Sequence, residues 1–149
     1  MMGCDRTVVY NHFEQTPASG WERNDTLSFV TTPITTNGDY DETVMLRINN
    51  DYPFMGITLV VEQTVYPTLL TVCDTLNCKL IDERGNAEGP GISEYQYAFP
   101  LRRLKLTEGN TLRISVRHDM KRGILPGVTD VGILIRTTPP IHHEQEESD

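Results

Sequence analysis

The stretch Thr43-Val44-Met45-Leu46-Arg47-Ile48 decides the fold expected for this chain. Its even positions hold the aliphatic residues Val44, Leu46 and Ile48, and a threonine, a methionine and an arginine occupy the positions between them. Successive side chains of a β-strand point to opposite faces, so this alternation is typical of a strand with one buried face. The segment therefore predicts a half-buried strand.

The same period of two recurs along the chain, and helical periodicity is almost absent. Further alternating apolar rows are Ile57, Leu59 and Val61, then Leu112, Ile114 and Val116, then Val131, Ile133 and Ile135. Shorter runs at 7–10, 27–32 and 95–106 bring the expected total to about eight strands. Turn residues separate the strands, and Glu108-Gly109-Asn110 is the clearest hairpin because Gly and Asn tolerate positive φ.

Many short strands without helices between them predict an all-β fold in which two antiparallel sheets pack face to face. A jelly-roll or Greek-key sandwich is the preferred form, and an open barrel is the alternative. At 149 residues the chain fits one domain. We expect a leader or tether over residues 1–19, the sandwich over 20–138 and a solvated acidic tail over 139–149.

The charge and the first cysteine bear on partners and location. A net charge of -8 argues against nucleic acid as a ligand, since phosphate binding requires clustered Lys and Arg. No apolar run reaches the roughly 20 residues of a membrane-spanning helix.

The sequence Gly3-Cys4, a small residue followed by Cys, is typical of the end of a bacterial lipoprotein signal peptide, where the Cys becomes acylated. Chance placement of Cys4 is the alternative.

Cys73 and Cys78 have a spacing that fits neither a redox motif nor a zinc knuckle. Cys78 shares its parity with a row of leucines, which favours one continuous strand through both cysteines. Five positions apart on one strand, the two side chains point to opposite faces. We therefore expect two free thiols, with Cys78 inside and Cys73 outside.

The segment Asn49-Asn50-Asp51-Tyr52-Pro53-Phe54 leaves a predicted strand and predicts a sharp corner. Short Asn and Asp side chains bond their own backbone in turns, and Pro53 donates to no ladder. The structural interpretation has Tyr52 and Phe54 plugging the end of the sandwich. The functional interpretation is a contact surface for a partner protein, formed by Asn50, Asp51, Tyr52 and Phe54.

His118-Asp119-Met120 follows an alternating strand whose parity places His118 inward. An inward His at a strand end most often bonds loop backbone, and no neighbouring acid has a catalytic spacing. His118 and Met120 join the partner-binding candidates. Farther along, Asp130 is expected to accept N–H groups of the preceding loop, and Gly132 to allow a close approach by a neighbour.

Two alternatives from another class concern binding of small ligands. In one alternative, Trp21 forms an exposed aromatic platform for sugar rings with Tyr40, Tyr10 and Phe13; in the other, Trp21 packs over a sheet edge. The carboxylates of Asp39-Tyr40-Asp41-Glu42 suggest calcium, although a solvated loop explains them as well. No catalytic triad, paired catalytic carboxylates or phosphate-binding loop is visible, so we expect no enzyme, no metal and no cofactor.

Several of these motifs together resemble the GldH family of gliding-motility lipoproteins from the cell envelope of Bacteroidetes. They are the Cys-Asp leader at Cys4, Trp21, the corner at 49–54, Asp74-Thr75-Leu76, the glycine-rich segment 82–91, Arg117-His118-Asp119-Met120 and Gly127-Val128-Thr129-Asp130-Val131-Gly132. The resemblance implies a non-enzymatic protein anchored by a lipid on Cys4, in the outer membrane or facing the periplasm. It also implies a role as a scaffold or accessory component of gliding or secretion machinery. The alternative function is a carbohydrate-binding module.

Overall fold

The computed structural model describes residues 7–80 and 94–139, and these form strands and connecting loops without a helix. No helix in this part of the chain is long and apolar enough to cross a membrane. Ten strands follow one another: β1 (Val8–Gln15), β2 (Trp21–Glu22), β3 (Leu27–Val30), β4 (Gly38–Asn49), β5 (Gly56–Tyr66), β6 (Leu70–Lys79), β7 (Glu94–Leu106), β8 (Thr111–His118), β9 (Ile124–Leu125) and β10 (Val128–Thr137).

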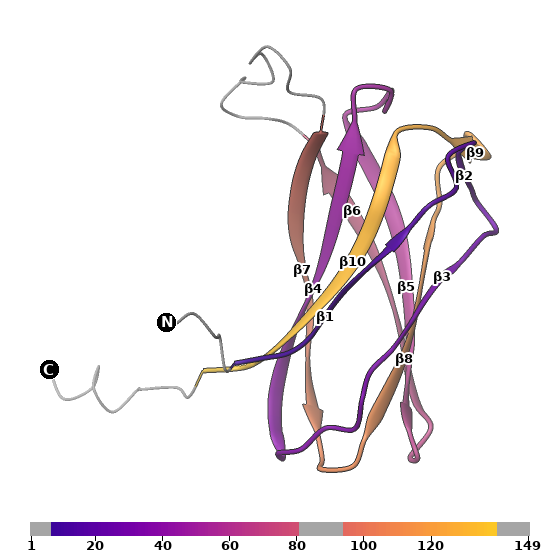
Figure 1. The fold of residues 1–149 in the computed structure, drawn as a ribbon. Coiled ribbons are helices and arrows are strands. Elements are labelled where there is room, and N and C mark those ends of the chain that lie inside the picture. Colours follow the sequence, from indigo (N-terminus) through magenta and orange to yellow (C-terminus); the bar gives the residue numbers. More distant parts are fainter. Residues whose placement is uncertain (1–6, 81–93, 140–149) are drawn as a thin grey trace, which may run out of the picture.

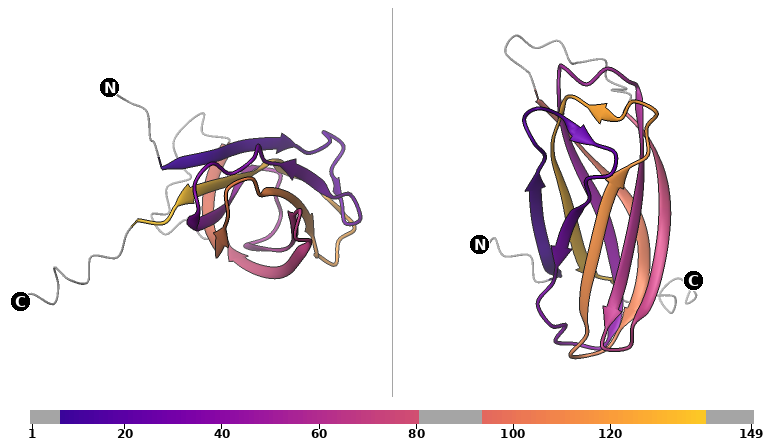
Figure 2. Two further views of the ribbon diagram at one scale, coloured as in Figure 1. Left: turned by 90° about the horizontal axis from the view of Figure 1, so that it is seen from below. Right: turned by 90° about the vertical axis from the view of Figure 1, so that its right-hand side faces the viewer.

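Eight of these strands form two four-stranded antiparallel sheets that face each other (Figures 1 and 2). The first sheet has the order β1-β10-β4-β7 and the second has the order β3-β8-β5-β6, while β2 and β9 make a separate short pair. Along the chain, the long strands change sheets at every step except between β5 and β6. Two interlocking Greek keys of this kind make a jelly roll, which confirms the predicted fold class.

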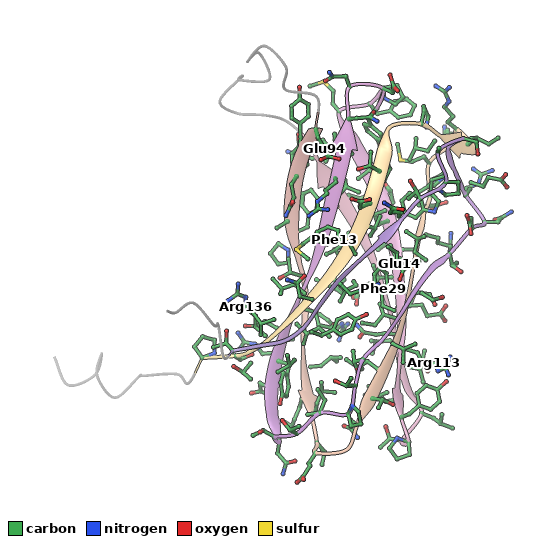
Figure 3. All side chains as sticks on the ribbon, viewed as in Figure 1. Phe13, Glu14, Phe29, Glu94, Arg113 and Arg136 are labelled. Atoms are coloured by element: carbon green, nitrogen blue, oxygen red, sulfur yellow. The ribbon has the colours of Figure 1, made fainter. Side chains whose placement is uncertain are left out.

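The core lies between the sheets and consists of the alternating rows that the sequence predicts. Val44, Leu46, Leu59, Val116 and Ile133 are all buried. Figure 3 shows Phe29 of β3 within the sandwich, with Arg113 and Arg136 on opposite sides of it. Burial of apolar surface is the main favourable term in folding, at about 25 cal/mol per Å².

The leader contributes a strand to the sandwich. Residues 8–15 form β1, which pairs with β10 along one edge of the first sheet. On the outer face, the Phe13 ring lies against Gly132, where an added Cβ would be 2.8 Å from the ring, so the expected close approach at Gly132 is confirmed. Arg47 then covers the ring, with its guanidinium carbon 3.9 Å from the ring centre.

The predicted hairpin at Glu108-Gly109-Asn110 connects β7 to β8. Gly109 has a φ of 94°. The Asn110 side chain accepts the Thr107 N–H at 2.8 Å, and the Asn110 N–H donates to the Thr107 carbonyl at 2.9 Å. Gly109 supplies the positive φ and Asn110 supplies the hydrogen bonds of the turn, as the sequence predicts.

One polar pair interrupts the apolar core. Glu42 of β4 and Gln63 of β5 are buried, and the Gln63 Nε2 donates to the Glu42 Oε1 at 2.7 Å. The Glu42 Oε2 and the Gln63 Oε1 have no partner among the described residues. Burial raises the pKa of Glu42 to about 7. Protonation of the Glu42 carboxylate suits this site because it converts one of these two oxygens from an acceptor without a partner into a donor.

The Glu42 pair makes stability depend on pH. In the unfolded chain Glu42 ionises near pH 4.5, whereas the folded protein holds the proton up to about pH 7. Between these values the folded state binds more protons, so the free energy of unfolding should fall by about 3 kcal/mol as the pH rises. Urea unfolding at pH 5 and pH 8 measures the change. Glu42→Gln should remove it, and Glu62→Gln, at an exposed position on β5, should not. Equal pH dependence of Glu42→Gln and the unaltered protein would contradict this.

Candidate functional site

Three of the motifs singled out in the sequence meet at one end of the sandwich, at the top of Figure 1; they are the segments 49–54 and 117–120 and the start of 127–132. We call residues 49–55 the corner and residues 119–127 the closing loop. The Asn49 side chain accepts the Asp51 N–H at 2.8 Å, and the Tyr52 N–H donates to the Asn49 carbonyl at 3.1 Å. The Asn50 side chain accepts the Tyr95 hydroxyl at 3.1 Å. These bonds form the turn that the short side chains predict.

The two corner aromatics have different surroundings. The Tyr52 ring packs against the core, and its hydroxyl donates to the Gly56 carbonyl at 2.7 Å. Burial raises the pKa of the Tyr52 phenol, which keeps the hydroxyl a donor. Phe54 meets Tyr52 edge-to-face at 5.9 Å but is 40% exposed, and the next residue, Met55, is 72% exposed. Tyr52 therefore caps the core, while Phe54 and Met55 form an exposed apolar pair.

The closing loop supports the corner through direct backbone contact. Gly127 has a φ of 88°, and a Cβ added there would lie 2.2 Å from the Tyr52 nitrogen. The Asn49 N–H donates to the Gly127 carbonyl at 2.8 Å. Glycine is required here both by the backbone conformation and by the space available. Sequence analysis named Gly127 within a motif but missed this role.

His118 is 0% exposed, as its parity predicts. Its Nδ1 accepts the Met120 N–H at 3.2 Å, so the proton lies on Nε2, which donates to the Trp21 carbonyl at 2.8 Å. Burial, the largest cause, lowers the pKa of His118. The neutral ring thus joins the start of the closing loop to the segment before β3, and both nitrogens are occupied by backbone.

Met120 and Phe54 line an open pocket of about 360 Å³ at this end, together with Thr58 and Asn77. The Met120 sulfur lies 3.3 Å from the Thr58 nitrogen. Among the partner-binding candidates, the structure thus brings Phe54, Tyr52 and Met120 together. His118 lies beneath them in the core.

The glycan-binding candidates require a correction. Trp21 is 0% exposed and Tyr40 is 1% exposed, so neither offers a ring face to a sugar. The Trp21 Nε1 donates to the Asp25 carbonyl at 2.7 Å, and its ring packs edge-to-face on His118 at 5.1 Å. The short pairing of β2 with β9 holds Trp21 inward. Its burial satisfies both the apolar ring and the N–H group.

The carboxylates of residues 39–42 diverge. Asp39 approaches Lys105 at 3.5 Å, Asp41 pairs with Arg103 at 2.8 Å, and Glu42 points into the core. In the described part of the chain no three His, Cys, Asp or Glu residues are placed to hold a metal.

Asp130 accepts a hydrogen bond from Arg47 at 3.1 Å instead of the expected loop N–H groups, because β10 pairs with β4 at this register.

Cys73 is exposed, Cys78 is buried and both are free thiols, which confirms the prediction. Burial raises the pKa of the Cys78 thiol to about 11. Cys4, segment 82–91 and the acidic tail from residue 140 lie outside the described residues.

Comparison with known proteins now adds to this geometry. A family model described as GldH lipoprotein matches residues 8–135, from the start of β1 to all but the last two residues of β10. The chain belongs to the GldH lipoprotein family. Membership places it among cell-envelope lipoproteins linked to gliding motility and confirms the resemblance seen in the sequence.

Two relatives are similar over most of their length. The gliding motility lipoprotein GldH homolog of Christiangramia forsetii is 26% identical over 141 residues, covering 89% of this chain and 85% of that protein. The gliding motility lipoprotein GldH of Flavobacterium johnsoniae is 24% identical over 142 residues, with coverages of 91% and 88%.

A solved structure shares the fold. A family GH115 4-O-methyl-α-glucuronidase with specificity for decorated arabinogalactans superposes with a TM-score of 0.50 and 13% identity. The superposition covers 93% of this chain but 19% of the enzyme. At this identity the match bears on the fold of the GldH-family domain alone.

Replacing His118 tests its role as a neutral link. At pH 7.5, His118→Ala should lower the free energy of unfolding by about 3 kcal/mol, because it leaves a cavity and removes two buried hydrogen bonds. The stabilisation that His118 contributes should also decrease as the pH falls below 6.5, where the unfolded His takes up a proton that the folded ring resists. Urea unfolding of the unaltered protein and of His118→Ala from pH 5 to pH 8 measures both effects. At each pH, the difference between the two free energies of unfolding gives the contribution of His118. His12→Ala, at an exposed site on β1, should cost under about 0.5 kcal/mol.

The Gly127 contact has a matched control in Gly109. Both residues have positive φ, but an added Cβ at Gly109 meets nothing within 4 Å. Gly109→Ala should cost about 1 kcal/mol for its conformation, and Gly127→Ala at least about 3 kcal/mol, because the corner must also move. Thermal or urea unfolding gives the comparison. Similar losses for the two variants would show that the corner is not held by this contact.

Proposed function

We propose that this GldH-family protein is a lipid-anchored, non-enzymatic scaffold or accessory component of gliding or secretion machinery. Acylation of Cys4 attaches it to the outer membrane or to a periplasm-facing surface. The corner then binds other envelope proteins. The observation that carries this proposal is the exposed pair Phe54 and Met55 on a tightly held turn.

The corner suits protein binding because it exposes two large apolar side chains and is already ordered. Phe54 and Met55 are large side chains next to the open pocket lined by Phe54, Thr58 and Met120. Aromatic residues and Met are enriched where proteins bind one another. The turn bonds of Asn49 and the backbone contact with Gly127 fix the turn, so little entropy remains to be lost on association.

The position of the anchor leaves the corner accessible. Strand β1 begins at Val8, at the lower left of Figure 1, and runs toward the corner end. Its eight residues span about 26 Å as an extended strand. Val8, four residues after the proposed lipid site Cys4, is therefore separated from the corner by the length of this strand.

The polar groups at this end support binding better than catalysis. A general base requires a free nitrogen or oxygen near a reacting group. Backbone groups occupy both nitrogens of His118, and Asp130 is paired with Arg47. The carbohydrate-binding alternative has no support from Trp21 and Tyr40, whose rings are buried.

Paired variants test the anchor and the corner separately. Cys4→Ala should move the protein from the membrane fraction to the soluble fraction. Phe54→Ser with Met55→Ser should leave it folded and membrane-bound but reduce co-purifying envelope proteins at least about tenfold, because two contact residues are lost. Immunoprecipitation from solubilised envelopes with mass spectrometry measures the partners. The control is Val30→Ser with Leu69→Ser, which removes exposed apolar side chains elsewhere. Unchanged partners in the corner variant would refute the proposal.

A further inference from the structure

The outer edge of β6 carries a second binding feature. We propose that an extended segment of a partner envelope protein adds to this edge as a fifth strand of the second sheet. The proposal rests on the function proposed above and specifies how the partner binds. In the described part of the chain, β6 pairs with β5 and with no other strand, so its far side is a sheet edge.

The other three edge strands are blunted in ways that prevent strand addition. β3 has four residues, and β1 has a register irregularity between Val8 and Tyr10. β7 contains Pro100 and has a register irregularity beside it, because Glu42 and Thr43 of β4 pair with Arg102 and Pro100. Short length, proline and bulges are the usual protection of sheet edges.

β6 lacks this protection. Its ten residues pair with β5 in one unbroken register from Leu70 to Lys79, without Gly or Pro. The outward, exposed row has no charge before its last member and consists of Thr71, Cys73, Thr75, Asn77 and Lys79. Asp74, in the other row, is neutralised by Arg102 through two bonds of 2.8 and 3.1 Å. A long, even edge whose charges are Lys79 at its end and the paired Asp74 is a template for another strand.

The direction of the β6 main-chain groups follows from bonds at the strand ends. The Leu80 N–H donates to the Met55 carbonyl, so even-numbered residues of β6 bond toward β5. On the other side of β5, the Thr58 carbonyl accepts from Asp119 of the β8 side, which agrees with this alternation. In an antiparallel ladder, the N–H and C=O groups of successive residues point alternately to one neighbouring strand and to the opposite side. The N–H and C=O groups of Cys73 and Thr75 therefore point to the open edge.

The surroundings define the chemistry of the added strand. Leu76 of β6 and Phe99 and Leu101 of β7 are only partly buried where the two sheets meet at this side. A strand beside β6 would direct every second side chain toward them, so the partner segment should alternate apolar and polar residues. Asn77 and Lys79 also line the pocket with Phe54, which joins this edge to the corner. A net charge of -8 on each chain opposes a second copy as the occupant.

Cys73 allows a direct test with the thiol reagent N-ethylmaleimide. It is exposed on β6, whereas the raised pKa of buried Cys78 makes that thiol unreactive. The rate of Cys73 alkylation, followed by mass spectrometry of its peptide, should be at least about tenfold lower in native envelopes than in the purified protein, because a paired strand places a side chain about 5 Å away.

Thr75→Pro removes one outward N–H without breaking the ladder with β5, and Thr75→Ala keeps that N–H. In envelopes, Thr75→Pro should restore rapid Cys73 alkylation and Thr75→Ala should not. Thermal unfolding checks that each variant folds. If Thr75→Pro does not fold, Thr75→Lys places a charge on the edge and should act in the same way.

The outcomes separate this proposal from the proposed function. Protection of Cys73 that Thr75→Pro or Thr75→Lys abolishes supports strand addition. Co-purifying proteins together with an unprotected Cys73 would overturn strand addition while the scaffold function stands. Absence of both would overturn both. Protection in the purified protein at high concentration, with a dimer on size-exclusion chromatography that Thr75→Pro removes, would identify a second copy and overturn the partner assignment.

Discussion

The structure depends on one constraint, which is that each sheet has an apolar face that only the other sheet covers. Alternation along β4, β5, β8 and β10 directs one row of side chains into this shared interior. Because the chain changes sheets at nearly every step, loops far apart in sequence collect at the same end of the sandwich. The corner and the closing loop meet for this reason, and their contact at Tyr52 and Gly127 is a product of the topology.

The inward rows, the turn at 108–110 and the positions of His118, Cys73 and Cys78 followed from the sequence because they depend on parity within one strand. Contacts between distant segments did not follow. Trp21 is buried through a two-residue pairing with β9, which has no detectable periodicity. Asp130 meets Arg47 because of the register of β10 on β4. Glu42 shares parity with Val44, so its burial was foreseeable once β4 was known to begin at Gly38.

Burial favours the neutral forms of Glu42 and His118, for the same physical reason. Burial disfavours charge, so it raises the pKa of Glu42 and lowers that of His118. Their polar atoms nevertheless fix neighbours: His118 orders Trp21 and Met120, and Glu42 joins β4 to β5 through Gln63. Acidification therefore weakens the contribution of His118 to stability and preserves the contribution of Glu42. The two effects oppose each other between pH 4.5 and 6.5.

In the proposed function, the lipid anchors the protein and the protein surface binds partners. The net charge of the chain supports this assignment. In the proposed anchoring through Cys4, each buried CH₂ of an acyl chain contributes about 0.8 kcal/mol to membrane binding, so the acyl chains supply more of the anchoring than the protein surface does. A chain with a net charge of -8 is repelled by anionic headgroups, which favours an orientation that stands away from the membrane. In the proposed arrangement, the exposed Phe54 and Met55 of the corner and the open β6 edge then face away from lipid. Main-chain pairing at such an edge resists changes in ionic strength, since it depends on neutral hydrogen bonds and not on exposed ion pairs.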